Sequence, residues 1–146
     1  MTFSVRTARE TDRAAWARLW AGYLAFYEST LAPDVTDTTW SRFHDPAEPM
    51  LCLVAEDEDG SLIGFTNIVF HRGTWAIGDF CYLEDLFVAP AARNRGIARA
   101  LIEAVYALAD QRGCERVYWL THETNTTARA LYDQVAHYRG FIHYRR

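Results

Sequence analysis

The chain has 146 residues, of which 50% are hydrophobic and 14% aromatic, and its formal net charge is −4. This composition excludes a disordered chain, and the length predicts a single domain covering residues 1–146. The negative charge argues against a nucleic-acid partner, which would need a basic face. No segment approaches the roughly 18 apolar residues of a membrane span, and the first residues contain no apolar secretion signal. We therefore expect a cytoplasmic protein with no membrane partner.

The N-terminal half predicts a strand, two helices and a β-hairpin. Residues 3–7 alternate as a strand does, and from Trp16 to Tyr27 the apolar residues recur at helical spacing. Pro33 is expected to end that helix, and a second short helix is expected from about 37 to 43. Two strands then follow, at 50–56 and 62–70. They flank Asp-Glu-Asp-Gly, which is a typical hairpin turn.

The C-terminal half predicts strands and helices in alternation. A strand is expected from Asp79 to Val88, with Gly78 marking a bulge before it. The helix after Gly96 is expected to close at Gly113. The remaining elements are a strand at 116–120, a helix capped by Asn125 or Thr126, and a final strand at 141–144.

Residues 82–99 predict a loop that binds a pyrophosphate. The strand breaks at Pro90, the basic loop 93–95 meets Gly96, and a helix follows. Backbone N–H groups at a helix start have no intrahelical acceptor, and the helix dipole favours negative charge there. Gly96 lets the backbone approach a ligand closely, while the loop arginines and Arg99 supply counter-charge. Neither a Walker loop nor a dinucleotide fingerprint is present.

The loop resembles a motif of the GNAT family of N-acetyltransferases, Arg/Gln-x-x-Gly-x-Gly/Ala, which Arg93, Gly96 and Ala98 match. The expected order of elements also agrees with that family's α/β fold, a mixed and largely antiparallel sheet with helices on both faces. The resemblance implies acetyl-coenzyme A as the cosubstrate, and dimers are common in the family. It implies cofactor contacts in the strand end, the loop and the last helix, at Leu86, Phe87, Val88, Arg93, Asn94, Arg95, Gly96, Ile97, Ala98, Arg99, Asn125 and Ala128.

Glu84 is the candidate general base, because an amine must lose a proton before it attacks a thioester. Alternation places Glu84 on the strand face that carries Leu86 and Val88, where desolvation would raise its pKa. An ion pair with a helix arginine is the alternative, and Asp85, expected on the opposite face, fits that alternative better. The segment Tyr-Leu-Glu-Asp-x-Phe-Val resembles polyamine acetyltransferases, whose glutamate contacts the substrate amine.

Tyr132 is the candidate proton donor to the departing thiolate. It ends a segment that resembles the family's Asn-x-x-Ala-x-x-Leu/Phe-Tyr motif, beginning at Asn125. The resemblance implies that the tyrosine hydroxyl lies beside the coenzyme sulfur. Packing by the ring alone is the alternative. The usual ending of this motif is stretched here, with eight residues between Leu131 and Gly140, so family features of that region are in doubt.

The acceptor amine is expected to meet Tyr27 and Glu28, a pair that resembles one lining the amine site of polyamine acetyltransferases. Aromatic rings and carboxylates suit a cation, although helix-end packing explains the same pair. Trp75 is a further candidate wall of the acceptor channel. No histidine or cysteine spacing is typical of a metal site, and Cys52, Cys81 and Cys114 are expected to be buried free thiols.

These patterns predict an acetyl-coenzyme A-dependent N-acetyltransferase that transfers an acetyl group directly to a primary amine. The expected acceptor is a small diamine, polyamine or amino-acid-like molecule. Two alternatives stay open. The acceptor lysine could belong to a protein, as in small histone acetyltransferases, or the domain could bind acyl-coenzyme A without catalysis.

Overall fold

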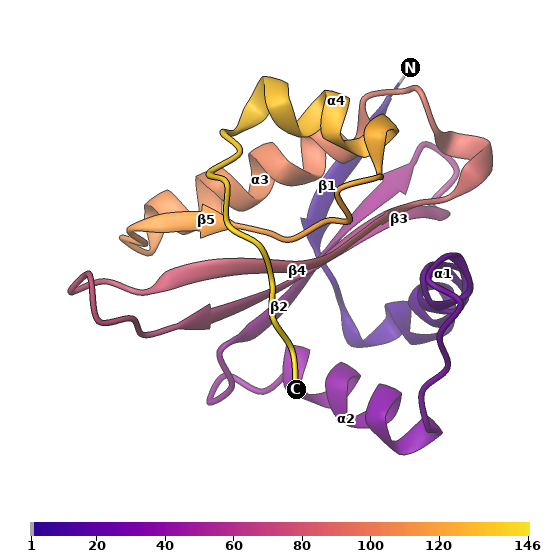
Figure 1. The fold of residues 1–146 in the computed structure, drawn as a ribbon. Coiled ribbons are helices and arrows are strands. Elements are labelled where there is room, and N and C mark those ends of the chain that lie inside the picture. Colours follow the sequence, from indigo (N-terminus) through magenta and orange to yellow (C-terminus); the bar gives the residue numbers. More distant parts are fainter. Residues whose placement is uncertain (1) are drawn as a thin grey trace.

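The fold is built on a five-stranded sheet whose strands follow the order β1-β2-β3-β4-β5 (Figure 1). The computed structural model describes residues 2–146. Its strands are β1 (Phe3–Thr7), β2 (Met50–Asp57), β3 (Leu62–His71), β4 (Phe80–Val88) and β5 (Arg116–Tyr118). The helices are η1 (Glu10–Asp12), α1 (Arg13–Phe26), α2 (Pro33–Phe43), η2 (Pro90–Ala92), α3 (Ile97–Gln111) and α4 (Thr126–Val135). Neighbouring strands are antiparallel except β4 and β5, which confirms the predicted mixed sheet.

Helices cover both faces of the sheet and produce two apolar cores (Figure 1). On one face α1 and α2 contribute an aromatic core, in which Trp16 is fully buried and lies 4.8 Å from Trp40 between ring centroids. On the other face α3 buries an aliphatic stripe of Ile97, Leu101 and Val105, as its helical spacing predicts. β4 lies between the two cores and contributes to both.

Two sequence-predicted boundaries are confirmed. The β2–β3 turn closes with a hydrogen bond of 2.8 Å from the Asp57 N–H to the Ser61 carbonyl. Gly113 follows α3 with φ of +69°, the left-handed conformation that glycine adopts readily, and the Cys114 N–H then donates to the Ala109 carbonyl.

The second helix begins earlier than predicted. α1 ends at Phe26, and Pro33 is the first residue of α2 rather than the terminator of α1. Proline suits this position because its missing N–H would have no helical acceptor there, and its fixed φ matches a helix.

The predicted final strand at 141–144 is wrong. Residues 136–146 form neither helix nor strand, and the side chains of Phe141 and Tyr144 are each 85% exposed. A strand needs backbone partners, and in Figure 1 this segment runs across the sheet rather than alongside β5. The local pattern was strand-like, but no neighbouring strand pairs with it.

The bulge lies in β4 and not at Gly78. Gly78 belongs to the β3–β4 loop, where a Cβ atom would come within 2.5 Å of the Gly113 carbonyl oxygen. In the strand pair, Asn67 is opposite Asp85 but the next residue, Ile68, is opposite Leu83. Glu84 is therefore an extra residue in β4, and the alternation of faces changes at this point.

Within residues 2–146 we find no helix with the length and apolar content needed to cross a membrane.

The aromatic core should dominate the folding stability. Trp16→Ala removes a fully buried ring that contacts Trp20, Trp40, Phe43 and Phe65, and we expect unfolding free energy to fall by about 3 to 5 kcal/mol. Phe141→Ala is the control, since that ring is exposed and its loss should cost less than about 0.5 kcal/mol. Urea unfolding measures both, and equal losses would contradict the fold described here.

Candidate active site

The loop between β4 and α3 presents a row of free backbone N–H groups. Across residues 2–146, none of the N–H groups from Asn94 to Arg99 has a hydrogen-bond acceptor, and the first satisfied one is that of Ala100, bonded to the Gly96 carbonyl. The positive end of α3 lies at the same place. An anion with several oxygens, such as a pyrophosphate, matches these donors.

Two residues in the left-handed region shape this loop. Asn94 has φ of +64° and Gly96 has φ of +81°, which turns successive N–H groups outward. A Cβ atom built on Gly96 would meet no protein atom within 4 Å. The space in front of Gly96 is therefore not filled by the protein, and the binding of a ligand there stays a prediction.

The three arginines of the loop region are held differently. Arg95 makes a bidentate ion pair with Asp57 in the β2–β3 turn, at 3.0 and 3.1 Å, and this pair lowers the pKa of the Asp57 carboxyl. Arg93 is exposed and donates to the Val88 carbonyl at 3.3 Å, while Arg99 contacts Gln134 of α4. Arg95 thus ties the loop to the sheet, and its predicted role as counter-charge to a phosphate stays a prediction.

The strands on either side of the candidate site separate after Tyr82. β5 pairs with β4 only from Phe80 to Tyr82, so the rest of β4, including Leu86–Val88, has no partner on that side. Figure 1 shows the chain after β5 leaving the sheet toward α4. The predicted cofactor residues of the strand, the loop and the start of α4 border this separation.

The bulge corrects the sequence prediction for Glu84 and Asp85. Leu83 and Leu86 both pack toward the α3 core, so two residues lie between them where strict alternation would place one or three. Glu84 is exposed and does not share a face with Leu86 and Val88. Asp85 is 8% exposed and, among the described residues, makes no ion pair with an arginine. Instead it accepts a hydrogen bond of 3.0 Å from the Asn67 side chain.

Both carboxyl groups have raised pKa values. Burial is the main cause for Asp85, partly offset by hydrogen bonds from Asn67 and Tyr23. For Glu84 the loss of solvent around the carboxylate comes first and the nearby Asp85 charge second. A base with a raised pKa accepts a proton more readily, which is the property that sequence reasoning assigned to Glu84.

Tyr132 lies half-buried on α4, with its ring 5.3 Å from that of Trp119. Burial, followed by the influence of Tyr27, raises the pKa of the Tyr132 hydroxyl to about 12. Tyr27 at the end of α1 lies 5.9 Å from His122 between ring centroids. The structure therefore brings residues from α1, α4 and the segment after β5 to one place.

The other predicted residues differ in their placement. Asn125 is the N-cap residue of α4, and its side chain donates to Thr121 rather than to the helix. Glu28 is exposed just after α1. Trp75 is 87% exposed in the β3–β4 loop, at the far end of β4 from the cofactor loop. Its role in an acceptor channel stays a prediction.

Sequence reasoning missed the polar residues behind Glu84. Asn67, Tyr23 and Asp85 come from three elements, and Asn67 is 3% exposed with its side-chain oxygen left without a partner. The only sequence signal was the acidic pair Glu84-Asp85 within an apolar strand, which alternation alone does not explain.

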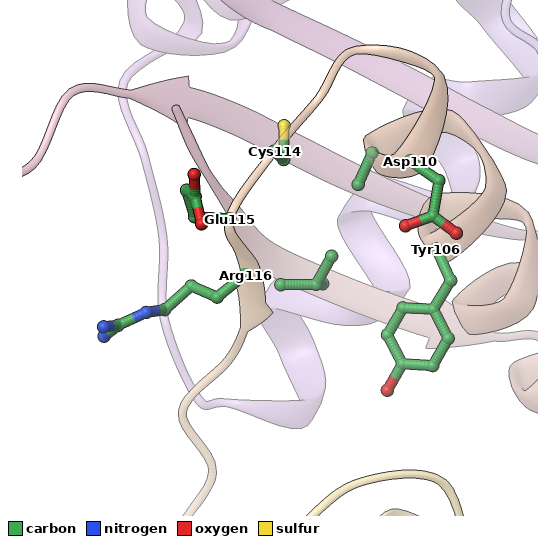
Figure 2. Close-up of a pocket in the computed structure, with 7 residues that line it drawn as sticks. Tyr106, Asp110, Cys114, Glu115 and Arg116 are labelled. Atoms are coloured by element: carbon green, nitrogen blue, oxygen red, sulfur yellow. The ribbon is translucent and has the colours of Figure 1, made fainter. Parts of the chain in front are cut away.

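A separate open hollow lies elsewhere on the molecule. It has a volume of about 430 Å³ and lies between the end of α3 and β5, lined by residues such as Tyr106, Cys114 and Arg116 (Figure 2). In Figure 2 the Arg116 side chain points away from Tyr106 and Asp110, so the charged groups do not converge on one ligand. We assign no chemistry to this hollow.

Comparison with known proteins decides the family. Residues 13–138 match the Acetyltransferase (GNAT) family. The chain belongs to the GNAT family. It is 37% identical to the D-amino-acid N-acetyltransferase HPA3 of Saccharomyces cerevisiae over 143 residues, covering 97% of this chain and 89% of that protein.

Other GNAT relatives act on different amines. The aminoglycoside N(6')-acetyltransferase type 1 of Klebsiella aerogenes is 29% identical, covering 94% of this chain and 93% of that protein. The solved structure of AAC(6')-Iy, in complex with a bisubstrate analogue containing coenzyme A, has a TM-score of 0.86 at 20% identity. That match covers 100% of this chain and 98% of the other. The protein is thus an acetyl-coenzyme A-dependent N-acetyltransferase with the GNAT fold, and the non-catalytic alternative is set aside.

The loop of free N–H groups at residues 94–99, which we call the cradle, can be tested as an anion site with a matched pair of glycine substitutions. Gly96→Asp places a side chain and a negative charge in front of the free N–H groups, so coenzyme A affinity should fall tenfold or more, about 1.4 kcal/mol. Gly140→Asp is the control, because Gly140 has nearly the same φ of +80° and an equally open Cβ position. Calorimetric titration with coenzyme A measures both. Similar affinities in the two folded variants would refute the cradle.

Proposed function

We propose that the protein acetylates a primary amine of a small molecule by direct transfer from acetyl-coenzyme A. The observation that carries this proposal is the arrangement around the separation of β4 and β5. The loop with free N–H groups follows the end of β4, and Glu84, an exposed carboxylate with a raised pKa, lies within β4 itself. A tyrosine hydroxyl reaches the region from α4. Bound acetyl-coenzyme A would supply a thioester to this place.

Glu84 acts as the base in this proposal. The bulge turns Glu84 out of the α3 core. Desolvation, and after it the charge of Asp85, raises the pKa of the Glu84 carboxyl. An ammonium group reaching Glu84 would lose its proton to the carboxylate, directly or through a water molecule, before attacking the thioester carbon. No covalent intermediate on the protein is required.

Tyr132 acts as the acid in this proposal. Its hydroxyl is protonated at neutral pH, as an ordinary tyrosine is, and burial raises its pKa further, to about 12. A neutral hydroxyl on α4 would donate a hydrogen bond to the departing sulfur as negative charge develops there, and the proton would follow as the sulfur leaves as a thiol. In this proposal the N-cap residue Asn125, together with Ala128, would contact the pantetheine arm.

The acceptor side favours a small amine over a protein tail. The residues proposed to face the acceptor are aromatic or acidic, which suits a cation. They are Tyr27, Glu28, Glu84 and Asp85. Relatives are named for D-amino acids, for aminoglycosides and, in Caenorhabditis elegans, for thialysine. All three are small amines, so we place this chain's acceptor in that class. A peptide lysine is the second candidate.

An amine panel tests the proposal. Free thiol released from acetyl-coenzyme A would be followed with D-amino acids, thialysine, diamines, amino alcohols, an aminoglycoside and a lysine peptide. Turnover with at least one small amine, exceeding that with the peptide, is the expected result. Turnover only with the peptide would favour the second candidate, and no turnover with any amine would refute the proposal.

Glu84→Gln tests the base. The substitution keeps the shape of the side chain and removes its basicity, so the rate at pH 7 should fall roughly 10²-fold. The loss should shrink as the pH rises, because more of the amine is then already unprotonated. Glu103→Gln on the exposed side of α3 is the control and should change nothing. A rate within twofold of the parent across this pH range would rule out Glu84 as the base.

Tyr132→Phe tests the acid. It keeps the ring that packs on Trp119 and removes only the hydroxyl, so coenzyme A affinity should persist while turnover falls ~10- to 10²-fold. Tyr106→Phe is the matched control, because that helical tyrosine donates to the Val135 carbonyl instead. Normal turnover in Tyr132→Phe would refute the acid role and leave the Tyr132 ring with a packing role alone.

A further inference from the structure

We propose that Tyr118 and His71 form a distal subsite that binds a hydroxyl group at the far end of the acceptor amine. This inference rests on the proposed function, since it assigns a second contact to the same acceptor. The predicted acceptor is therefore a hydroxylated amine, such as an amino alcohol or an amino sugar.

The His71 ring has a defined proton arrangement. Its Nδ1 atom lies 2.7 Å from the Arg72 carbonyl oxygen. A carbonyl can only accept, so Nδ1 carries the hydrogen, and in the neutral ring Nε2 is an acceptor. Sequence reasoning read His71 as a structural or surface residue, because no histidine spacing is typical of a metal site.

This arrangement fixes the Tyr118 hydroxyl in turn. The Tyr118 oxygen lies 2.6 Å from His71 Nε2, which is a short hydrogen bond between a hydroxyl donor and a ring nitrogen. With its hydrogen directed at His71, the hydroxyl oxygen keeps only lone pairs for other partners. Toward a ligand, the Tyr118 oxygen can therefore only accept a hydrogen bond, which selects a ligand group with an O–H or N–H donor.

The pair lies within reach of an acceptor bound at Glu84. Tyr118 is opposite Tyr82 in the β4–β5 register, and the two rings stack with centroids 5.0 Å apart. Glu84 is two residues beyond Tyr82 along the strand, about 7 Å at strand spacing. Burial, and to a smaller extent Glu84, raises the pKa of the Tyr118 hydroxyl, which agrees with this proximity.

Nearby charge favours a neutral donor over a second ammonium group. The Arg116 guanidinium lies 4.2 Å from the centroid of the Phe80 ring, and the Phe80 ring also packs against His71. Arg72, in contrast, is paired with Asp79 at 3.5 Å. Among the described residues Arg116 has no ion pair, so its charge opposes a cation at the outer end of the subsite.

The test compares substrates on one enzyme, which removes any effect of partial folding. The parent should have kcat/KM for 5-amino-1-pentanol about fivefold or more above that for n-pentylamine, the range expected of one neutral hydrogen bond. The kcat/KM for 1,5-diaminopentane should exceed that for n-pentylamine by a smaller factor than the kcat/KM for the amino alcohol does. In Tyr118→Phe the ratio of kcat/KM for 5-amino-1-pentanol to kcat/KM for n-pentylamine should fall to within twofold of one.

A double-mutant cycle tests whether His71 acts through Tyr118. His71→Leu should lower the ratio in the parent, because the hydroxyl can then rotate, and should change nothing further in Tyr118→Phe. Tyr106→Phe is the control that keeps the parental ratio. An unaltered ratio in Tyr118→Phe, or additive effects of the two substitutions, would overturn the subsite.

The remaining outcomes separate the two proposals. A parent that acetylates both amines without preference refutes the subsite while the proposed function stands. A parent that acetylates no amine of any kind refutes the proposed function and the subsite with it.

Discussion

The extra residue in β4 is the constraint on which the site depends. Because Asn67 pairs with Asp85 and Ile68 with Leu83, Glu84 has no partner in β3 and turns outward. A bulge also bends its strand and increases the local twist. It lies just beyond Tyr82, where β5 stops following β4. One inserted residue thus exposes a carboxylate beside the point where the two strands separate, while Leu83 and Leu86 both keep their contacts with the α3 core.

The polar residues behind the bulge have no evident structural purpose. A buried carboxylate costs stability unless it is well paired, and Asp85 has hydrogen bonds but no cationic partner among the described residues. The Asn67 side-chain oxygen is also buried without a partner. An apolar pair at these positions would suit the aromatic core better. The arrangement fits the proposed chemistry, however, because Asp85 adds to the desolvation that raises the pKa of Glu84, the proposed base for an ammonium proton.

The sequence was informative wherever a local pattern determines the backbone. The β2–β3 turn, the stripe of α3 and the Gly96 loop each depend on a few adjacent residues, and each was predicted correctly. The bulge was missed because alternation assumes one residue on each strand at every step. The strand at 141–144 failed for the opposite reason, since its local pattern was suitable but the fold offers no partner. Likewise, nothing near Arg95 in the sequence indicates its ion pair with Asp57.

The cofactor side and the acceptor side of the candidate site use different groups of the protein, backbone N–H groups in the first and side chains in the second. The cofactor loop relies on backbone N–H groups and is fixed by a bidentate ion pair to the β2–β3 turn, so its geometry depends little on individual side chains. The proposed acceptor side uses the side chains of Tyr27, Tyr118 and His71, and Tyr27 also lies against the His122 ring. These side chains come from different elements, so a substitution of one of them is expected to alter acceptor contacts and leave the loop after β4 intact. Relatives of this chain are named for D-amino acids, thialysine and aminoglycosides, which are different acceptors. In the proposed site, acceptor contacts come from a few side chains on β3, β5 and the end of α1, while the cofactor contacts come from the loop after β4.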